Sequence, residues 1–135
     1  VLVEEILRLE GPVQGLFRET AEDIELHGVA IPKGSVINVR YAAANLDDTM
    51  FETPEKLNLE RENSRQHLAF GFGTHYCMGA PLARREILLS FKVLLERIDE
   101  MWFLDGLNDF RHHPNFCLRA LRELHIGFTR CKPSA

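Results

Sequence analysis

The chain opens with apolar positions at helical spacing. They are Leu2, Val3, Ile6, Leu7 and Leu9, and the helix-breaking pair Gly11-Pro12 follows them. Apolar residues that recur every three to four positions predict an amphipathic helix that stops at this pair. Because no initiating methionine and no capping Ser, Thr, Asp or Asn precedes the pattern, we expect a chain cut from something longer.

The pattern then changes to short alternating stretches. The segments DIELHG and VAIP meet at a His-Gly pair, and KGSVINV begins after a proline. Alternation of apolar and polar residues predicts short, partly buried strands here. The run YAAAN at residues 41–45 predicts one or two helical turns. Residues 47–66 are polar, are interrupted by Pro54 and keep no period, so we expect a long irregular segment of the kind that is functional or disordered.

The second half contains the strongest helical pattern of the chain. Its apolar stripe is Ile87, Phe91, Leu94, Leu95 and Ile98. This spacing predicts a helix from Pro81 to about Ile98. Further on, FCLRAL (116–121) and LHIGFT (124–129) are the candidate strands of a small hairpin. The predicted fold class is α+β, mainly helical.

Composition and charge narrow the class of protein. The 135 residues are 45% hydrophobic and carry a formal net charge of −4, which fits one modest domain with a core and argues against a disordered chain. Mild acidity removes the electrostatic reason to expect nucleic acid as a partner. No apolar run has the length of a membrane span and no charged-then-apolar leader opens the chain. We therefore expect a soluble cytoplasmic protein with no membrane partner.

The cysteine content also favours a cytoplasmic protein. There are three, Cys77, Cys117 and Cys131, an odd number with wide spacing that does not suit a secreted disulfide framework. No C-x-x-C pair occurs, which argues against a closed zinc or iron–sulfur site.

Candidate chemistry gathers in the segment HLAFGFGTHYCMGAPLARRE, residues 67–86. Cys77 lies just before the helix that Pro81 introduces, where unpaired N–H groups and the helix dipole stabilise a thiolate over a thiol. A thiolate in a glycine-lined loop is a nucleophile or a metal ligand, and His75 is the only close candidate for the base that a nucleophile needs. A lone cysteine before a helix is otherwise a small buried hydrophobe.

The joint spacing resembles a known family. FGFGTHYCMGAPLAR is similar to the haem-binding loop of the cytochromes P450, the haem-thiolate monooxygenases. Phe70, Gly73, Cys77 and Gly79 fill the family pattern Phe-x-x-Gly-x-x-x-Cys-x-Gly. The longer form typical of bacterial members is matched through His75, Leu82, Ala83 and Arg84. The resemblance covers essentially the whole chain, in order.

The resemblance implies a cofactor and its contacts. The cofactor is haem b (iron protoporphyrin IX), with Cys77 as the proximal thiolate ligand of the iron and the residue of direct catalytic importance. The other implied cofactor-binding residues are Arg18 and His75 at the propionates, Phe70 beside the sulfur, Gly71, Gly73 and Gly79, which let the porphyrin approach, and Ala83 against the macrocycle.

The resemblance also nominates structural and substrate-binding residues. Glu5 and Arg8 supply a Glu-x-x-Arg pair on one helix face, although Glu4 at i, i+4 competes for Arg8. The family's third partner is an arginine in the irregular segment, and Arg61 is the candidate here. The implied substrate-binding residues are Val13, Gly15, Leu16, Phe116, Cys117 and Leu118, for each of which core packing is the equal alternative.

Arg84 and Arg85 lie in the first turn of a helix, where the dipole disfavours positive charge. One hypothesis is a patch on the proximal face of the haem for an acidic electron-donor protein. An exposed pair partly balanced by Glu86 is the alternative.

The implied fold is the C-terminal part of the cytochrome P450 fold: K helix, small β-sheet, irregular meander, cysteine haem loop, L helix and C-terminal β-hairpin. Residues 1–135 would be the C-terminal haem-binding portion of a single larger domain. The implied enzyme inserts one atom of dioxygen into a small hydrophobic organic substrate, with electrons from a ferredoxin or flavoprotein, and we expect this chain alone not to be competent. The alternatives are a non-catalytic haem-binding or haem-sensing protein and, less well supported, a cysteine-nucleophile enzyme.

Overall fold

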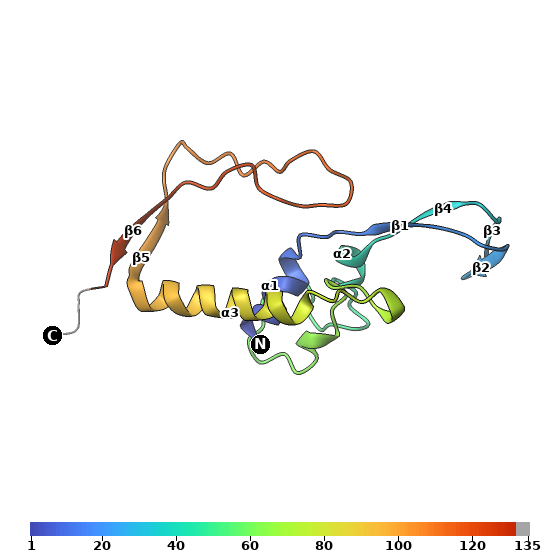
Figure 1. Ribbon diagram of the computed structural model, residues 1–135, viewed down its shortest axis with the longest axis horizontal. Coiled ribbons are helices and arrows are strands. Elements are labelled where there is room, and N and C mark those ends of the chain that lie inside the picture. The colour runs from blue at the N-terminus through green and yellow to red at the C-terminus, as the bar shows by residue number, and fades with distance from the viewer. Residues whose placement is uncertain (132–135) are drawn as a thin grey trace.

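The structure, a computed structural model, describes residues 1–131 of the chain (Figure 1). In chain order the elements are α1 (Leu2–Glu10), β1 (Leu16–Glu19), β2 (Ile24–Leu26), β3 (Val29–Ile31), β4 (Val36–Val39), α2 (Tyr41–Ala44), the 3-10 turns η1 (Ser64–Gln66) and η2 (Gly73–His75), α3 (Ala80–Arg97), β5 (Ile98–Phe103) and β6 (Ile126–Arg130). The α+β class is confirmed. The helices hold more residues than the strands, but turns and loops hold more than either.

The patterns of the sequence locate most of these elements. The predicted helices correspond to α1, α2 and α3, and the alternating stretches correspond to β2, β3 and β4. The long helix begins with Gly79 as its N-cap and a proline in its first turn, where a missing N–H costs nothing. Residues 47–66 are irregular apart from the turn at η1, as predicted.

Three two-stranded antiparallel sheets replace a single small sheet. They pair β1 with β4, β2 with β3, and β5 with β6. The pattern did not predict β1, whose four residues are all exposed and lack an alternating burial. Its pairing starts immediately after Gly15, where an added Cβ would lie 2.6 Å from the carbonyl oxygen of Val39. A side chain at residue 15 would therefore push the two strands apart.

The predicted C-terminal hairpin is wrong. Strand β6 pairs with β5, directly after α3, and not with residues 116–121. The 116–121 segment uses its backbone elsewhere: the Gln14 N–H donates to the Cys117 carbonyl at 2.7 Å, and the Arg119 N–H donates to the Pro12 carbonyl at 2.8 Å. This segment therefore lies along the stretch after α1, and β6 pairs with β5 instead.

The elements form an open arrangement rather than a closed one. In Figure 1 the long helix α3 lies along the molecule, β5 and β6 rise from its C-terminal end, and the β1–β4 ribbon extends beyond its other end. Ile87, Phe91 and Ile98 of the α3 stripe are half-buried, whereas Leu94 and Leu95 are exposed. In the part of the chain that the structure describes, no helix combines the length and the apolarity that crossing a membrane would require.

The centre of the fold is an ion pair. Glu5 and Arg8, one turn apart on α1, both have fully buried side chains, and the Arg8 Nε lies 2.7 Å from the Glu5 Oε1. The Arg8 Nη atoms donate to three main-chain carbonyls, that of Asn45 at the end of α2 and those of Pro54 and Lys56 in the irregular segment. The guanidinium also lies over the Phe51 ring, 5.1 Å from its centroid. Arg8 therefore ties the irregular segment to α1.

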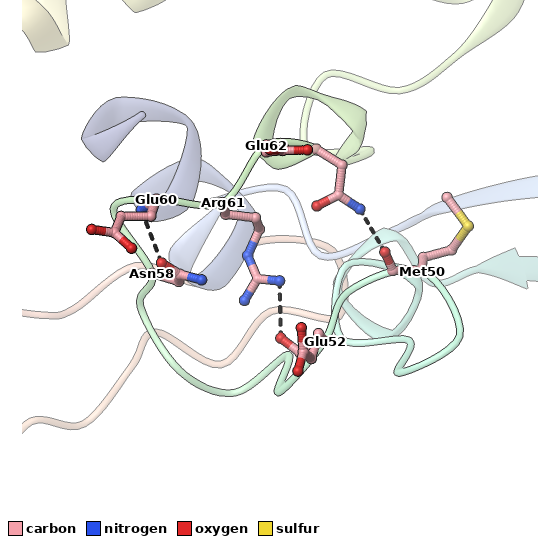
Figure 2. A pocket seen from close by; sticks show the side chains of 7 residues that line it. Met50, Glu52, Asn58, Glu60, Arg61 and Glu62 are labelled. Atoms are coloured by element: carbon pink, nitrogen blue, oxygen red, sulfur yellow. Dashed lines mark hydrogen bonds between the residues drawn. The ribbon is translucent and has the colours of Figure 1, made fainter.

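Arg61 completes this centre from the irregular segment. Its Nε lies 3.1 Å from the Glu5 Oε1, and its side chain is almost fully buried. Its Nη1 donates to the Glu52 carbonyl at 2.9 Å, as Figure 2 shows. The structure thus brings Arg61, the residue nominated as third partner, to the Glu5–Arg8 pair.

Burial and hydrogen bonding act in opposite directions on Glu5. Burial by itself would raise the pKa of this carboxyl, but hydrogen bonds from Arg8, from the Asn58 N–H and from Arg61 outweigh it and lower the pKa to about 2. The carboxylate accepts the Asn58 N–H at 3.0 Å. Glu5 is consequently held as an anion.

Replacing Arg8 should destabilise the fold strongly. In R8M the Glu5 carboxylate keeps its burial and loses its main partner, and three carbonyls lose their donor. Breaking a buried pair in this way costs about 3–5 kcal/mol, which urea denaturation would measure as a fall in the free energy of unfolding. The matched control is R85M, which removes an exposed arginine of α3. A loss no larger than that of the control would contradict the role given to Arg8.

Stability should also fall in acid because of Glu5. Its folded pKa lies below its unfolded value, so between about pH 5 and pH 2 the unfolded chain binds the proton first. The stabilisation is present above this window and is lost as the pH falls through it. Denaturation midpoints measured across the window should decline more steeply for the parent chain than for E5Q. Equal slopes would show that Glu5 does not carry this dependence.

Candidate functional site

The segment from His67 to Gly79 forms a tight loop that ends at α3. The Cys77 N–H donates to the Phe70 carbonyl at 2.9 Å, and the Tyr76 N–H donates to the Gly73 carbonyl at 3.0 Å. Gly71 and Gly73 have φ angles of 73° and 70°, in the left-handed region that glycine adopts without strain. These two glycines let the chain fold back, so that Phe70 lies opposite Cys77.

The Cys77 thiol is open on one side. The residue is exposed and its sulfur carries no disulfide. Gly79 lies next to it, and a Cβ added there would be 3.7 Å from the Cys77 Sγ. The absence of a side chain at Gly79 therefore leaves space directly beside the sulfur.

A cavity of about 430 Å³ lies above this loop, a size within the usual range for small-molecule sites. Its lining residues are Leu7, Pro12, Val13, Leu16, Tyr41, Ala69, Phe70, Gly71, His75, Cys77, Ala83 and Ile87. Most of the lining is apolar, with a thiol and an imidazole among it. The cavity brings together seven residues that the resemblance nominated, from the stretch after α1, the cysteine loop and α3: Val13, Leu16, Phe70, Gly71, His75, Cys77 and Ala83.

Other nominated residues lie around this cavity rather than in its lining. Leu118 forms an antiparallel bridge with Val13, so the 116–118 segment lies along the stretch that contributes Val13. The Phe116 carbonyl accepts a hydrogen bond from Arg40 at 3.1 Å, while its ring is 85% exposed.

Arg18 is on the exposed strand β1. Its Nη1 donates to the carbonyl of the neighbouring Phe17 at 2.8 Å, and among the described residues no carboxylate forms an ion pair with it. Gly15, beside the β1–β4 pairing, and Gly73 and Gly79, in the loop, likewise contribute to backbone shape and not to the lining.

Sequence reasoning missed five lining residues and one buried cluster. The lining residues are Leu7, Pro12, Tyr41, Ala69 and Ile87. Leu7 and Ile87 belong to helical stripes that the periodicity marks as apolar, but periodicity cannot say whether a stripe meets core or cavity. No signal in the sequence connects them to Cys77.

The missed cluster is centred on Glu4, whose side chain is buried on α1. Its Oε2 lies 3.0 Å from the His67 Nε2, and its two oxygens accept the Arg84 Nε–H at 2.8 and 3.1 Å. Burial would raise the pKa of Glu4, but these partners lower it below its ordinary value. The ion pair in turn raises the pKa of Arg84, so both groups stay charged.

His67 joins this cluster as a neutral ring. Its Nδ1 accepts the Ala69 N–H at 3.1 Å, so the ring proton is on Nε2 and is donated to Glu4. Burial lowers the pKa of His67, against the opposing effect of Glu4. The ring is therefore fixed in one tautomer.

Arg84 also contacts Tyr76 and Phe70, which neither the donor-protein patch nor the exposed-pair alternative predicted. Besides its pair with Glu4, its Nη1 donates to the Tyr76 hydroxyl at 2.9 Å, and its guanidinium lies over the Phe70 ring at 4.6 Å from the centroid. Arg85, by contrast, is exposed.

Comparison with known proteins identifies the family. The family model described as Cytochrome P450 matches residues 1–100. The chain belongs to the cytochrome P450 family. Cytochrome P450 CYP107DY1 of Priestia megaterium is 41% identical over 126 residues, which cover 93% of this chain and 30% of that protein. The polyketide biosynthesis cytochrome P450 PksS of Bacillus subtilis is 39% identical over 129 residues, which cover 95% of this chain and 32% of that protein.

A solved structure supports the same conclusion at the level of the fold. Mycobacterium marinum cytochrome P450 CYP150A6 in its substrate-free form matches with a TM-score of 0.91 and 36% identity, over 96% of this chain and 33% of that chain. The chain thus spans about a third of the length of these cytochromes P450. Membership in the family implies a haem cofactor.

The residues at Cys77 fit a haem. A flat macrocycle needs an apolar cavity with one ligand atom exposed to it and with little bulk beside that atom. The cavity is mostly apolar, Cys77 lines it, and Gly79 leaves open the space next to the sulfur.

A second cavity, of about 500 Å³, lies within the irregular segment and shares no lining residue with the first. Figure 2 shows its side chains, among which Asn58 accepts the Glu60 N–H. The Asn63 side chain donates to the Met50 carbonyl. Its polar groups stabilise the loop that contains them.

His67 should titrate below the ordinary pKa of histidine. Burial disfavours its imidazolium form, and nuclear magnetic resonance of the ring across pH would measure this, with the ring nitrogens reporting the proton on Nε2. In E4Q the anion that favours the imidazolium is gone, so the pKa of His67 should fall further. A normal or raised pKa, or a proton on Nδ1 of the neutral ring, would contradict the geometry described.

Proposed function

We propose that the chain is the thiolate side of a bacterial cytochrome P450 monooxygenase, with Cys77 as the axial ligand of haem b. The observation that carries the proposal is the cavity at Cys77: an exposed sulfur, a glycine beside it and a mostly apolar lining. When bound, haem supplies the iron chemistry that activates dioxygen. The donation of electron density by a thiolate favours this chemistry over simple oxygen binding.

The residues of the chain would then act on the cofactor as follows. Cys77 binds the iron, and the Phe70 carbonyl holds the Cys77 N–H. Ala83 lies on the cavity wall, where a small side chain leaves room for the macrocycle. His75, on the same lining, would hydrogen-bond one propionate, and Arg18 is the proposed partner of the other. The loop has no side chain at Gly71, Gly73 or Gly79 that would obstruct the approach of the macrocycle.

The segments take the family's roles under this proposal. Helix α1 is the K helix, α3 is the L helix, residues 47–66 are the meander and residues 67–79 are the cysteine loop. The three two-stranded sheets are parts of the family's small sheets. Residues 1–135 form the C-terminal haem-binding portion of a single larger domain, a proposal supported by the share of each relative that the chain covers.

The substrate would be a small, hydrophobic organic molecule. The lining is apolar, and Val13 and Leu16 contribute to it from the stretch after α1. Leu118 forms a backbone bridge with Val13, so residues 116–118 lie beside a stretch that lines the cavity. We propose Val13, Gly15, Leu16, Phe116, Cys117 and Leu118 as the substrate-side residues. The electron donor would be a ferredoxin or a flavoprotein, and the site of action the cytoplasm.

The absorption spectrum tests this function directly. The chain is mixed with haem, reduced and exposed to carbon monoxide. Thiolate ligation by Cys77 should give a strongly red-shifted Soret band that is absent in C77A. The matched control is C131A, which removes another free, exposed cysteine and should keep the band.

Two outcomes would contradict the proposal. A band typical of histidine-ligated haem would mean that Cys77 is not the ligand. A red-shifted band that persists in C77A would mean that another cysteine supplies the thiolate. A non-catalytic haem-binding protein would give the same red-shifted band, but in the complete protein that contains this chain it would turn over no substrate.

A further inference from the structure

Phe70 is the residue through which the Cys77 loop is held. Its carbonyl accepts the Cys77 N–H at 2.9 Å, and its ring lines the cavity together with Cys77. The ring has an edge-on neighbour in Tyr76, the residue before the cysteine, with ring centroids 6.4 Å apart. The position of the sulfur therefore depends on how firmly these two aromatic side chains are fixed.

Arg84 contacts both of these aromatic side chains. Its guanidinium lies 4.6 Å from the centre of the Phe70 ring, and its Nη1 donates to the Tyr76 hydroxyl at 2.9 Å. A planar guanidinium can stack on one ring and donate within its own plane to another group, which an ammonium cannot do in the same way. Arg84 thus fixes one aromatic side chain by stacking and the other by hydrogen bonding.

Glu4 and His67 fix Arg84 in turn. The Glu4 carboxylate accepts the Arg84 Nε–H on both oxygens, and its Oε2 also accepts the Nε2–H of His67. Glu4 is on α1, His67 begins the loop and Arg84 begins the second turn of α3. The cluster therefore joins three segments around the base of the Cys77 loop.

Helix stability does not explain an arginine at this position. Arg84 is the fifth residue of α3, nearer the positive end of the helix dipole, where a cation gains no stabilisation from the dipole. The Arg84 side chain is only 26% exposed and its charge is met by Glu4, not by solvent. What the arginine gains at this place is its contacts with Glu4, Phe70 and Tyr76.

We propose that Arg84, held by Glu4 and His67, is a positioning residue that fixes Phe70 and Tyr76 and thereby sets the geometry of Cys77 as a ligand. The part of this inference that concerns ligation rests on the proposed function. The part that concerns the loop does not require haem.

Amide hydrogen exchange of the haem-free chain tests the loop. In R84Q the Cys77 N–H should exchange at least about fivefold faster, because its hydrogen bond to Phe70 opens more often. The internal reference is the Leu104 N–H, which donates to the His125 carbonyl at 3.1 Å in the C-terminal region and should keep its rate. The matched control R85Q removes the neighbouring exposed arginine and should leave both amides unchanged. R84K keeps the charge but not the planar fork, so its Cys77 rate should lie between those of the parent and R84Q.

The haem-loaded chain gives the second readout. R84Q should lower the fraction of reduced, carbon monoxide-bound haem that shows the red-shifted band, R84K should restore part of it, and R85Q should match the parent. A general loss of stability would instead speed exchange at Cys77 and Leu104 alike.

The outcomes separate this inference from the proposed function. Equal Cys77 exchange in R84Q and R85Q would overturn the positioning role, as would unfolding of both R84Q and R84K under conditions where R85Q stays folded. If the parent shows no red-shifted band, the proposed function fails, and the exchange comparison still decides the role of Arg84 in the loop. Faster exchange in R84Q with an unchanged band would overturn the link from loop to ligand.

Discussion

The fold depends on a buried ion pair whose two charged groups have no contact with water. Glu5 and Arg8 lie inside the molecule with no exposed side-chain surface, and a buried charge is tolerated only when each of its hydrogen-bonding groups is satisfied. Arg8 donates to the main-chain carbonyls of Asn45, Pro54 and Lys56. Glu5 accepts the Asn58 N–H and forms a second ion pair with Arg61. A segment without helix or sheet is thereby given one conformation.

Helix α1 stabilises two separate regions of the fold because it carries two adjacent carboxylates. Glu5 organises the irregular segment, while Glu4 pairs with His67 and Arg84 at the base of the cysteine loop. Both carboxylates are buried, and hydrogen-bonded cations lower the pKa of each despite that burial. The loop that presents Cys77 is consequently attached to the same helix as the irregular segment. The cavity is lined by this loop, by Leu7 of α1 and by the stretch after α1.

The motif of the cysteine loop was the strongest signal in the sequence, for a local reason. Gly71 and Gly73 have positive φ angles, and Gly79 leaves space beside the sulfur. Such requirements belong to single positions and leave a fixed spacing in the sequence. The helices were equally predictable, since α1 and α3 lie where the apolar stripes predict them. The Glu-x-x-Arg pair is a weaker signal: its spacing is common, and only its burial makes it central.

What the sequence determined by itself was local: the helices, the short strands β2 to β4, the irregular segment and the glycine-shaped loop with its cysteine. The tertiary structure alone decided which distant groups meet. It paired β6 with β5 instead of residues 116–121, brought Arg61 to Glu5 and joined Arg84 to Glu4 across 80 positions. The physical reason is that a period or a turn records the conformation of neighbouring residues, whereas the choice among distant partners follows from burial and from the need to pair buried charges and polar groups.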